Sequence, residues 1–497
     1  MIKTTLFNTV KDAVWYGAST MLARVSVVVL LPLYARWFVP AELGVVQGLI
    51  VMTNFCYVIM ALQLISVTMR FYYEYEREGQ LNELLGTLMA VLCLSIVSFG
   101  SFFIFKAFWI STYLFKSPAY RLTVVLALVG TAFWVVNDYL LALMRLRRRV
   151  VHYFLLSFFQ FVGVVILNVI FIRYIVKGID GVFWAMLFTN VILFVLLAFF
   201  GHIPAKLKWS TAIAKRAAKY TTPALIIPVM EWFRNYFYQL YSLKYFGEAQ
   251  LGIISVAIRF VQIYILFDTA IALAWQPTSM SVIEHSRGKE LYRYYYRYLM
   301  CVYLVLFVVL SLFSKEIILL AATEKYVSAF RCVPLLFLMP LGKALYSHYS
   351  MGITISEKTI YRTIANVCGA AVAIILIVFL GYIGGQYGVL IGSGIGSLAI
   401  ALIALPFSNK YFRIGYSMRP LVITLLCCTV VSIYNAWIAN LEVSGLEIAG
   451  KVMAVVALIA LLYRYWLYGN EKEYIHNFMR SVGLRLRLAR PMENYHG

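Results

Sequence analysis

Apolar runs of about 20 residues recur along this chain from end to end. Each run is long enough for an α-helix to cross the roughly 30 Å hydrocarbon core of a membrane. The composition agrees, because 63% of the residues are hydrophobic and only 13% are charged, about half the charged share of soluble domains. The alternating pattern of a membrane β-barrel does not occur. We therefore expect an all-α polytopic membrane protein.

The runs predict about fourteen transmembrane helices, at 14–38, 43–66, 84–105, 121–144, 151–174, 181–201, 219–243, 250–275, 292–313, 327–348, 361–382, 386–407, 418–439 and 446–468. Lys and Arg gather in alternate loops, which places the N-terminus in the cytoplasm. An even number of spans returns the C-terminus to the same side. The net charge of +22 then reflects topology and attraction to anionic membrane lipids, and no nucleic-acid partner is expected.

The chain repeats itself at an offset of 207 or 208 residues. AELGVVQG (41–48) matches AQLGIISV (249–256), and GIDGV (178–182) matches GQYGV (385–389). The first six spans and the next six are therefore two parallel bundles, related by a pseudo-two-fold axis along the membrane normal, as in many transporters. The predicted organisation is 1–205 for the first bundle, 206–415 for the second, 416–470 for two extra helices and 471–497 for a basic cytoplasmic tail.

Other local patterns in the sequence are less informative about function. Seven cysteines and six histidines show no metal-ligand spacing, so no metal site is expected. GLEIAGK (445–451) matches part of a phosphate-binding loop, but Val452 replaces the Ser or Thr and no strand precedes it. Gly388, Gly392 and Gly396 recur every four residues, which favours close helix packing.

Three segments resemble a known family: LLPLYARWFVPAELGVVQ (30–47), YFGEAQLGIISVAIRFVQ (245–262) and YGVLIGSGIG (387–396). They are similar to the polysaccharide-transport branch of the multidrug/oligosaccharidyl-lipid/polysaccharide exporter superfamily, which contains O-antigen and exopolysaccharide flippases. The loop at 70–86 lacks the Gly…Asp-Arg motif of major-facilitator carriers. The resemblance implies two bundles around a central cavity that opens alternately to each side of a bacterial cytoplasmic membrane.

The substrate implied by the resemblance is a polyprenyl-diphosphate-linked oligosaccharide, moved from the cytoplasmic to the outer leaflet. Cationic residues in the cavity would hold the diphosphate. No cofactor and no enzymatic activity are expected, and other polysaccharide synthesis or export proteins are candidate partners.

Arginines within the spans are the candidate substrate-binding residues. An ionised side chain at a helix centre costs about 2.5–3.5 kcal/mol on insertion scales, so it tends to line a cavity or find a partner. Arg24, Arg234 and Arg259 lie well inside predicted spans, and the guanidinium fork suits a diphosphate. For Arg234 the alternative is an ion pair with Glu231, three residues earlier on the same helix face.

Asp138, Glu231 and Asp268 are the candidate groups for coupling transport to a proton or sodium gradient. The alternative is that each neutralises a basic residue. A drug or cation exporter of the same superfamily would favour an acidic cavity, and a membrane enzyme would need a large extramembrane loop, which this chain lacks. A membrane subunit of a polysaccharide export complex is a further hypothesis.

Overall fold

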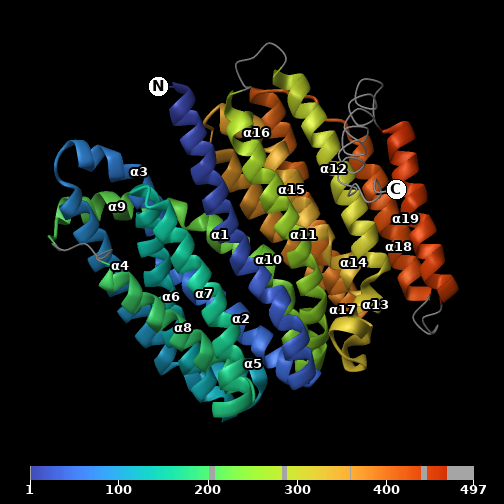
Figure 1. Cartoon of the computed structure of the whole chain (residues 1–497), viewed down its shortest axis with the longest axis horizontal. Coiled ribbons are helices and arrows are strands. Elements are labelled where there is room, and N and C mark those ends of the chain that lie inside the picture. The colour runs from blue at the N-terminus through green and yellow to red at the C-terminus, as the bar shows by residue number, and fades with distance from the viewer. Residues whose placement is uncertain (1, 201–207, 282–287, 359, 438–444, 467–497) are drawn as a thin grey trace, which may run out of the picture.

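The computed structural model of this chain describes residues 2–200, 208–281, 288–358, 360–437 and 445–466. Within these ranges the regular structure is helical and contains no β-strand, which confirms the expected fold class. Figure 1 shows two groups of helices that lie close together at one end and spread apart at the other, where α1 begins. We call this spread end the N-terminal face.

The helices of the first half of the chain are α1 (Ile2–Trp37), α2 (Pro40–Ala61), α3 (Leu64–Arg77), α4 (Leu81–Phe105), α5 (Ala107–Phe115), the 3-10 turn η1 (Pro118–Tyr120), α6 (Arg121–Leu146), α7 (Val150–Ile170), the π-turn η2 (Phe171–Ile175) and α8 (Ile179–Phe199). The second half contains α9 (Thr211–Ala224), α10 (Ile226–Phe246), α11 (Glu248–Ser281), α12 (Gly288–Leu312), α13 (Ser314–Ala321), η3 (Glu324–Arg331), α14 (Val333–Leu336), α15 (Leu338–Tyr349), α16 (Met351–Ile355) and α17 (Ile360–Tyr411). Two further helices, α18 (Arg419–Trp437) and α19 (Gly445–Tyr465), pack against α12.

Helices occupy all fourteen predicted spans. Ten helices among the described residues are long and apolar enough to cross a membrane. The helices Glu324–Arg331 and Val333–Tyr349, which meet at a bend of 49°, make an eleventh when the two are counted as one span. One of the ten, α17, is 52 residues long and contains two predicted spans. The chain is therefore a multi-pass membrane protein.

The predicted span 219–243 is divided between α9 and α10, which meet at Leu225. Proline explains the division, because Pro228 cannot donate to the carbonyl of Ala224, the last residue of α9, and its ring crowds that carbonyl. α9 lies beside α3 (Figure 1), where the Arg216 guanidinium donates to Glu74 Oε1 at 2.7 Å. The first helix after residue 205 thus packs against the first half of the chain.

α17 is a hairpin rather than one straight helix. Its backbone leaves the helical region at Gly385, with φ 58° and ψ −144°, a conformation that glycine adopts without strain. Beyond the break, the glycine series predicted to pack closely does so. A Cβ on Gly388 would lie 1.9 Å from the Leu380 carbonyl oxygen, and one on Gly396 would lie 2.3 Å from Ala373 Cβ.

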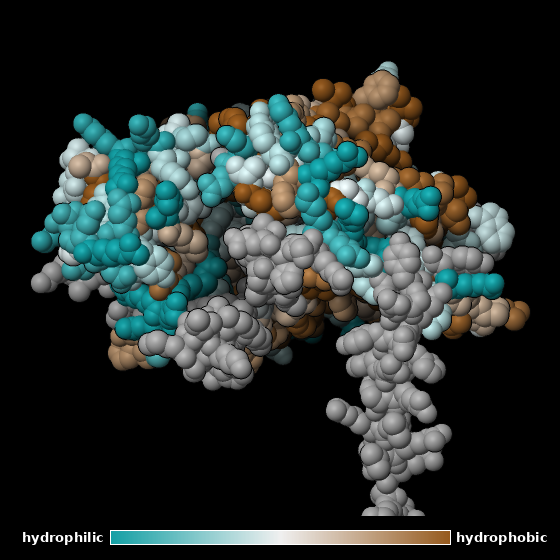
Figure 2. All heavy atoms as spheres, turned by 90° about the horizontal axis from the view of Figure 1, so that it is seen from above, coloured by the Kyte–Doolittle hydropathy of each residue, from teal (hydrophilic) through white to brown (hydrophobic). Residues whose placement is uncertain are grey.

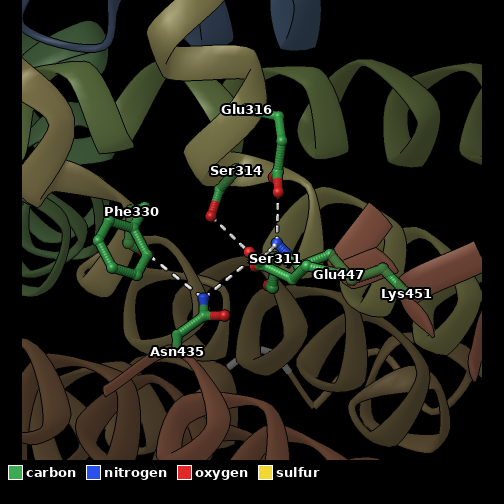
Figure 3. Close-up of polar contacts among 7 residues, drawn as sticks. All are labelled: Ser311, Ser314, Glu316, Phe330, Asn435, Glu447 and Lys451. Atoms are coloured by element: carbon green, nitrogen blue, oxygen red, sulfur yellow. Dashed lines mark hydrogen bonds and ion pairs between the residues drawn. The ribbon is translucent and has the colours of Figure 1, made fainter. Parts of the chain in front are cut away.

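A buried polar cluster attaches α18 and α19 to the second group of helices (Figure 3). Lys451 Nζ of α19 lies 2.5 Å from Glu316 Oε1 of α13 and 2.7 Å from Glu447 Oε1. The Lys451 side chain is 1% exposed, and the two carboxylate side chains are 17% and 11% exposed. Asn435 Nδ2 of α18 donates to the Ser311 carbonyl oxygen at 3.0 Å. Both terminal helices are therefore fixed by polar contacts as well as by apolar packing.

Large apolar side chains cover the flanks of the molecule. Leu94 and Val97, in the middle of α4, and Ile375, in the middle of the first arm of α17, are each 64% exposed, which is the pattern of a surface that faces lipid rather than water. Figure 2, which looks onto the N-terminal face, shows hydrophilic residues gathered over that face and hydrophobic residues at its edges. The distribution is that of a protein with a polar face at this end and apolar flanks.

Candidate functional site

The two halves of the chain touch most closely where α2 and α11 begin, at the end opposite the N-terminal face. A Cβ on Gly44 would lie 1.8 Å from the Glu248 carbonyl oxygen, and one on Gly252 would lie 1.8 Å from the Pro40 carbonyl oxygen. The sequence repeat aligns Gly44 with Gly252 and Pro40 with Glu248. The two contacts are therefore equivalent positions of one pseudo-two-fold arrangement, and only glycine permits either of them.

Further along α2 the interface with α10 is polar. Gln47 Nε2 donates to Gln239 Oε1 at 2.8 Å, and both amides are buried. The Trp232 indole N–H donates to the Val51 carbonyl oxygen at 3.3 Å. Buried polar groups with directed partners fix the register between the two helices, so the contact between the halves is specific in this conformation.

Arg234 of α10 is buried, with 3% of its surface exposed. The Glu231 carboxylate and the neutral phenol of Tyr346 lie near it. The ion pair that the sequence spacing allows is not formed, since Glu231 and Arg234, both within the described part of the chain, do not approach within 4.0 Å. The Arg234 Nε has no hydrogen-bond partner. A buried guanidinium with unused donors can accept an anionic partner.

Arg259 of α11 is buried where α1, α11 and η3 meet, with 4% of its surface exposed. One of its nitrogens donates to the Ser255 carbonyl oxygen at 2.7 Å, and its Nε has no partner. The neutral phenols of Tyr34 and Tyr326 lie near it. Among the described residues no carboxylate neutralises this cation, which distinguishes it from an ordinary buried ion pair.

The structure describes the side chains of two of the three predicted arginines. Arg24 lies on α1, and its side chain is outside the described residues. Arg234 and Arg259 have different neighbouring groups. Their roles in binding a substrate therefore stay predictions.

Each half of the chain holds one predicted acid against a tyrosine. The Tyr57 hydroxyl of α2 donates to Asp138 of α6, and the Tyr303 hydroxyl of α12 donates to Asp268 of α11. Neither aspartate forms an ion pair with a described basic residue. Sequence reasoning missed both phenols, because the chain has 37 tyrosines and each partner lies far away in sequence.

Comparison with known families shows which family this chain belongs to. Residues 33–331 match the family described as "Polysaccharide biosynthesis protein". The chain belongs to this family. The match extends over more than half of the chain and includes both copies of the repeated segment. A comparison with curated protein sequences found no match.

Solved structures similar to this family member are transporters. An inward-facing multidrug resistance MATE family transporter of the MOP superfamily aligns with a TM-score of 0.64 at 16% identity, covering 80% of this chain and 94% of that one. A eukaryotic MATE transporter aligns with a TM-score of 0.58 at 12% identity, covering 85% and 98%. An outward-facing MATE transporter reaches 0.53 at 18% identity, covering 82% and 96%. The likeness shows that this chain has the fold of the MATE transporters.

Proposed function

We propose that this protein is a flippase that moves a polyprenyl-diphosphate-linked oligosaccharide from the cytoplasmic to the outer leaflet of a bacterial cytoplasmic membrane. The lipid-linked sugar would serve the synthesis or export of a surface polysaccharide. Both termini would be cytoplasmic, which makes the N-terminal face the cytoplasmic one.

Arg259 carries this proposal. Burying a cation without a carboxylate costs several kcal/mol of desolvation, so such a residue is expected to serve a ligand that supplies the missing negative charge. A diphosphate supplies that charge and accepts the parallel hydrogen bonds of a guanidinium. Arg234 supports the same chemistry from the neighbouring helix, because it is equally buried and does not pair with Glu231.

Alternating access is supported by the contacts between α2 and α11. The two glycine contacts close the molecule at the end that we assign to the outside, while the helices spread apart at the N-terminal face. The greater similarity to the inward-facing MATE structure agrees with this orientation. Transport would require Gly44 and Gly252 to part from their partners so that a substrate headgroup can leave.

Asp138 and Asp268 are the candidate coupling groups. Each carboxylate accepts a hydrogen bond from a phenol in its own half of the chain. If a proton or a sodium ion replaced the phenol as the partner of the carboxylate, the packing of α2 on α6, or of α11 on α12, would change. Glu231, which has no ion-pair partner among the described residues, is the third candidate.

The test uses purified protein in liposomes that carry a polyprenyl-diphosphate oligosaccharide in one leaflet. A membrane-impermeant reagent that modifies the sugar reports how fast the lipid reaches the opposite leaflet. We expect flipping by the wild type and roughly a tenfold slower rate with Arg259→Ala, because the headgroup loses its counter-charge. Lys343→Ala is the matched control, since Lys343 is an exposed cation on α15.

Equal rates for all three proteins would remove the cationic-site argument. Absence of flipping by the wild type, with several lipid-linked sugars, would favour one of two other functions. A multidrug exporter is supported by the description of the similar MATE transporter, and efflux of organic cations from the same liposomes would reveal it. A subunit of an export complex would flip lipid only after its partners are added.

A further inference from the structure

A second group of cations lies at the N-terminal face, between α12 of the second repeat and the two terminal helices α18 and α19. The structure has a cavity of about 530 Å³ there, bounded by the first turns of α12, the segment 415–420 and Trp466. Three guanidinium groups and one carboxylate line it: Arg293, Arg297, Arg419 and Glu290. The cavity is therefore built to accept negative charge, and nothing in the proposed transport route uses it.

The arginines of this cavity are held in place by neighbouring groups. Arg293 Nε donates to the Ile414 carbonyl oxygen at 2.7 Å, and its guanidinium lies 3.7 Å from the Cβ position of Gly415, whose φ is +79°. The Arg297 guanidinium lies 5.3 Å from the centre of the Tyr294 ring. Positioned guanidinium groups lose less side-chain entropy when they bind an anion than mobile surface lysines do.

Two further features favour binding of an anion in this cavity over filling by water alone. Arg419 is the first residue of α18, so the positive end of that helix dipole points toward the cavity. Arg293 and Arg419 form no ion pair with any carboxylate in the described parts of the chain. The single lining carboxylate, Glu290, accepts a hydrogen bond from the Tyr294 hydroxyl at 3.1 Å.

An apolar groove of about 560 Å³ follows on the same three helices. Its walls are formed by Val308 and Leu312 of α12, by Leu426 and Val430 of α18, and by Leu458 of α19. Ile423 of the charged cavity and Leu426 of the groove are one turn apart on α18. Arg419 and Val430 are separated by about 16 Å along that helix, roughly the thickness of one leaflet's hydrocarbon layer.

We propose that this combined site binds an anionic glycerophospholipid, with its phosphate on Arg293, Arg297 and Arg419 and an acyl chain in the groove. The site combines a phosphate-binding end at the membrane surface with an apolar channel at the depth of the chains. Trp466 and Tyr294 line the charged cavity, and such amphipathic rings are favoured at the membrane–water interface. Free phosphate would use the charged cavity but would gain nothing from the groove.

The experiment measures lipid retention by the purified full chain, using native mass spectrometry after exchange into detergent with phosphatidylglycerol or phosphatidylcholine. The test variant is Arg293→Gln with Arg419→Gln. The matched control is Lys289→Gln with Lys410→Gln, which removes the same charge from two lysines outside the cavity lining. We expect about a thirtyfold loss of phosphatidylglycerol affinity in the test variant and little change in the control.

Val430→Trp fills the groove without altering charge, and it distinguishes a lipid from a free anion. The proposal is supported if this variant binds phosphatidylglycerol more weakly while it keeps the wild-type unfolding temperature. Equal retention of phosphatidylglycerol and phosphatidylcholine, or an equal loss in the control variant, would overturn it. Competition by inorganic phosphate that is unaffected by Val430→Trp would show a soluble-anion site instead. None of these outcomes depends on flipping of a sugar lipid.

Discussion

Replacing Lys451 by Met tests how the terminal helices are held to the rest of the molecule. The substitution removes the one ammonium group between Glu316 and Glu447, whose side chains are 17% and 11% exposed, and leaves both carboxylates without it. Breaking a buried ion pair from one side costs about 3–5 kcal/mol. We expect the free energy of unfolding to fall by that amount, because the side chain is 1% exposed and water cannot replace it.

The assay is reversible unfolding in mixed micelles with increasing sodium dodecyl sulfate, followed by circular dichroism. Lys219→Met on α9 is the control, because Lys219 is exposed and surface substitutions change stability by less than about 0.5 kcal/mol. The triple variant Lys451→Met, Glu316→Leu, Glu447→Leu separates lost charge balance from lost packing. We expect it to recover most of the stability, since apolar replacement of a whole buried ion cluster is often neutral or stabilising.

If the unfolding free energy of Lys451→Met lay within about 0.5 kcal/mol of wild type, this reasoning would be refuted, because ordinary surface substitutions have effects of that size. It would mean that the carboxylates reach water or other partners as soon as the lysine is removed. A triple variant less stable than Lys451→Met would show that the cluster contributes net stability, beyond the cost of unpaired charge.

Three other predictions concern the transport cycle. Gly44→Ala and Gly252→Ala should each force α2 and α11 apart at the closed end and so increase the labelling of an outer-facing cysteine by an impermeant reagent. Gly384→Ala is the control, because a Cβ there meets no atom within 4 Å. Unchanged labelling in all three variants would contradict the idea that the contacts between α2 and α11 close this end. Arg259→Lys should flip lipid faster than Arg259→Ala in the liposome assay, because it keeps the charge and loses only the guanidinium fork. Asp268→Asn should make the flipping rate insensitive to an imposed proton or sodium gradient; a rate that still follows the gradient would remove Asp268 from the coupling scheme.

The fold was predictable from the sequence because the membrane imposes length and hydropathy on every crossing helix. The repeat aligns Gly44 with Gly252, and the close approach of α2 and α11 explains why both positions are glycine. The four-residue glycine spacing in 388–396 predicted close packing for the same reason. Each of these signals can be read from the order of residue types along the chain, without knowing how the helices are rotated against one another.

The candidate site was less predictable because its contacts join distant helices. Tyr57 and Tyr303 are partners of Asp138 and Asp268 only through the packing of separate helices. In the sequence, Lys451 belongs only to a partial match to a phosphate-binding loop, yet it is the centre of a buried cluster. Partner choice inside a helical bundle depends on rotation of each helix about its axis, which hydropathy does not determine.

The hairpin of α17 also has a consequence for how the protein is made. Its two arms are joined at Gly385 through a link, GYIGGQYG (381–388), that carries no charge. Moving a charged side chain through the bilayer centre costs several kcal/mol, whereas this link imposes no such cost. The two arms can therefore insert into the membrane together as one helical hairpin, which has close contacts between its arms at Gly388, Gly392 and Gly396.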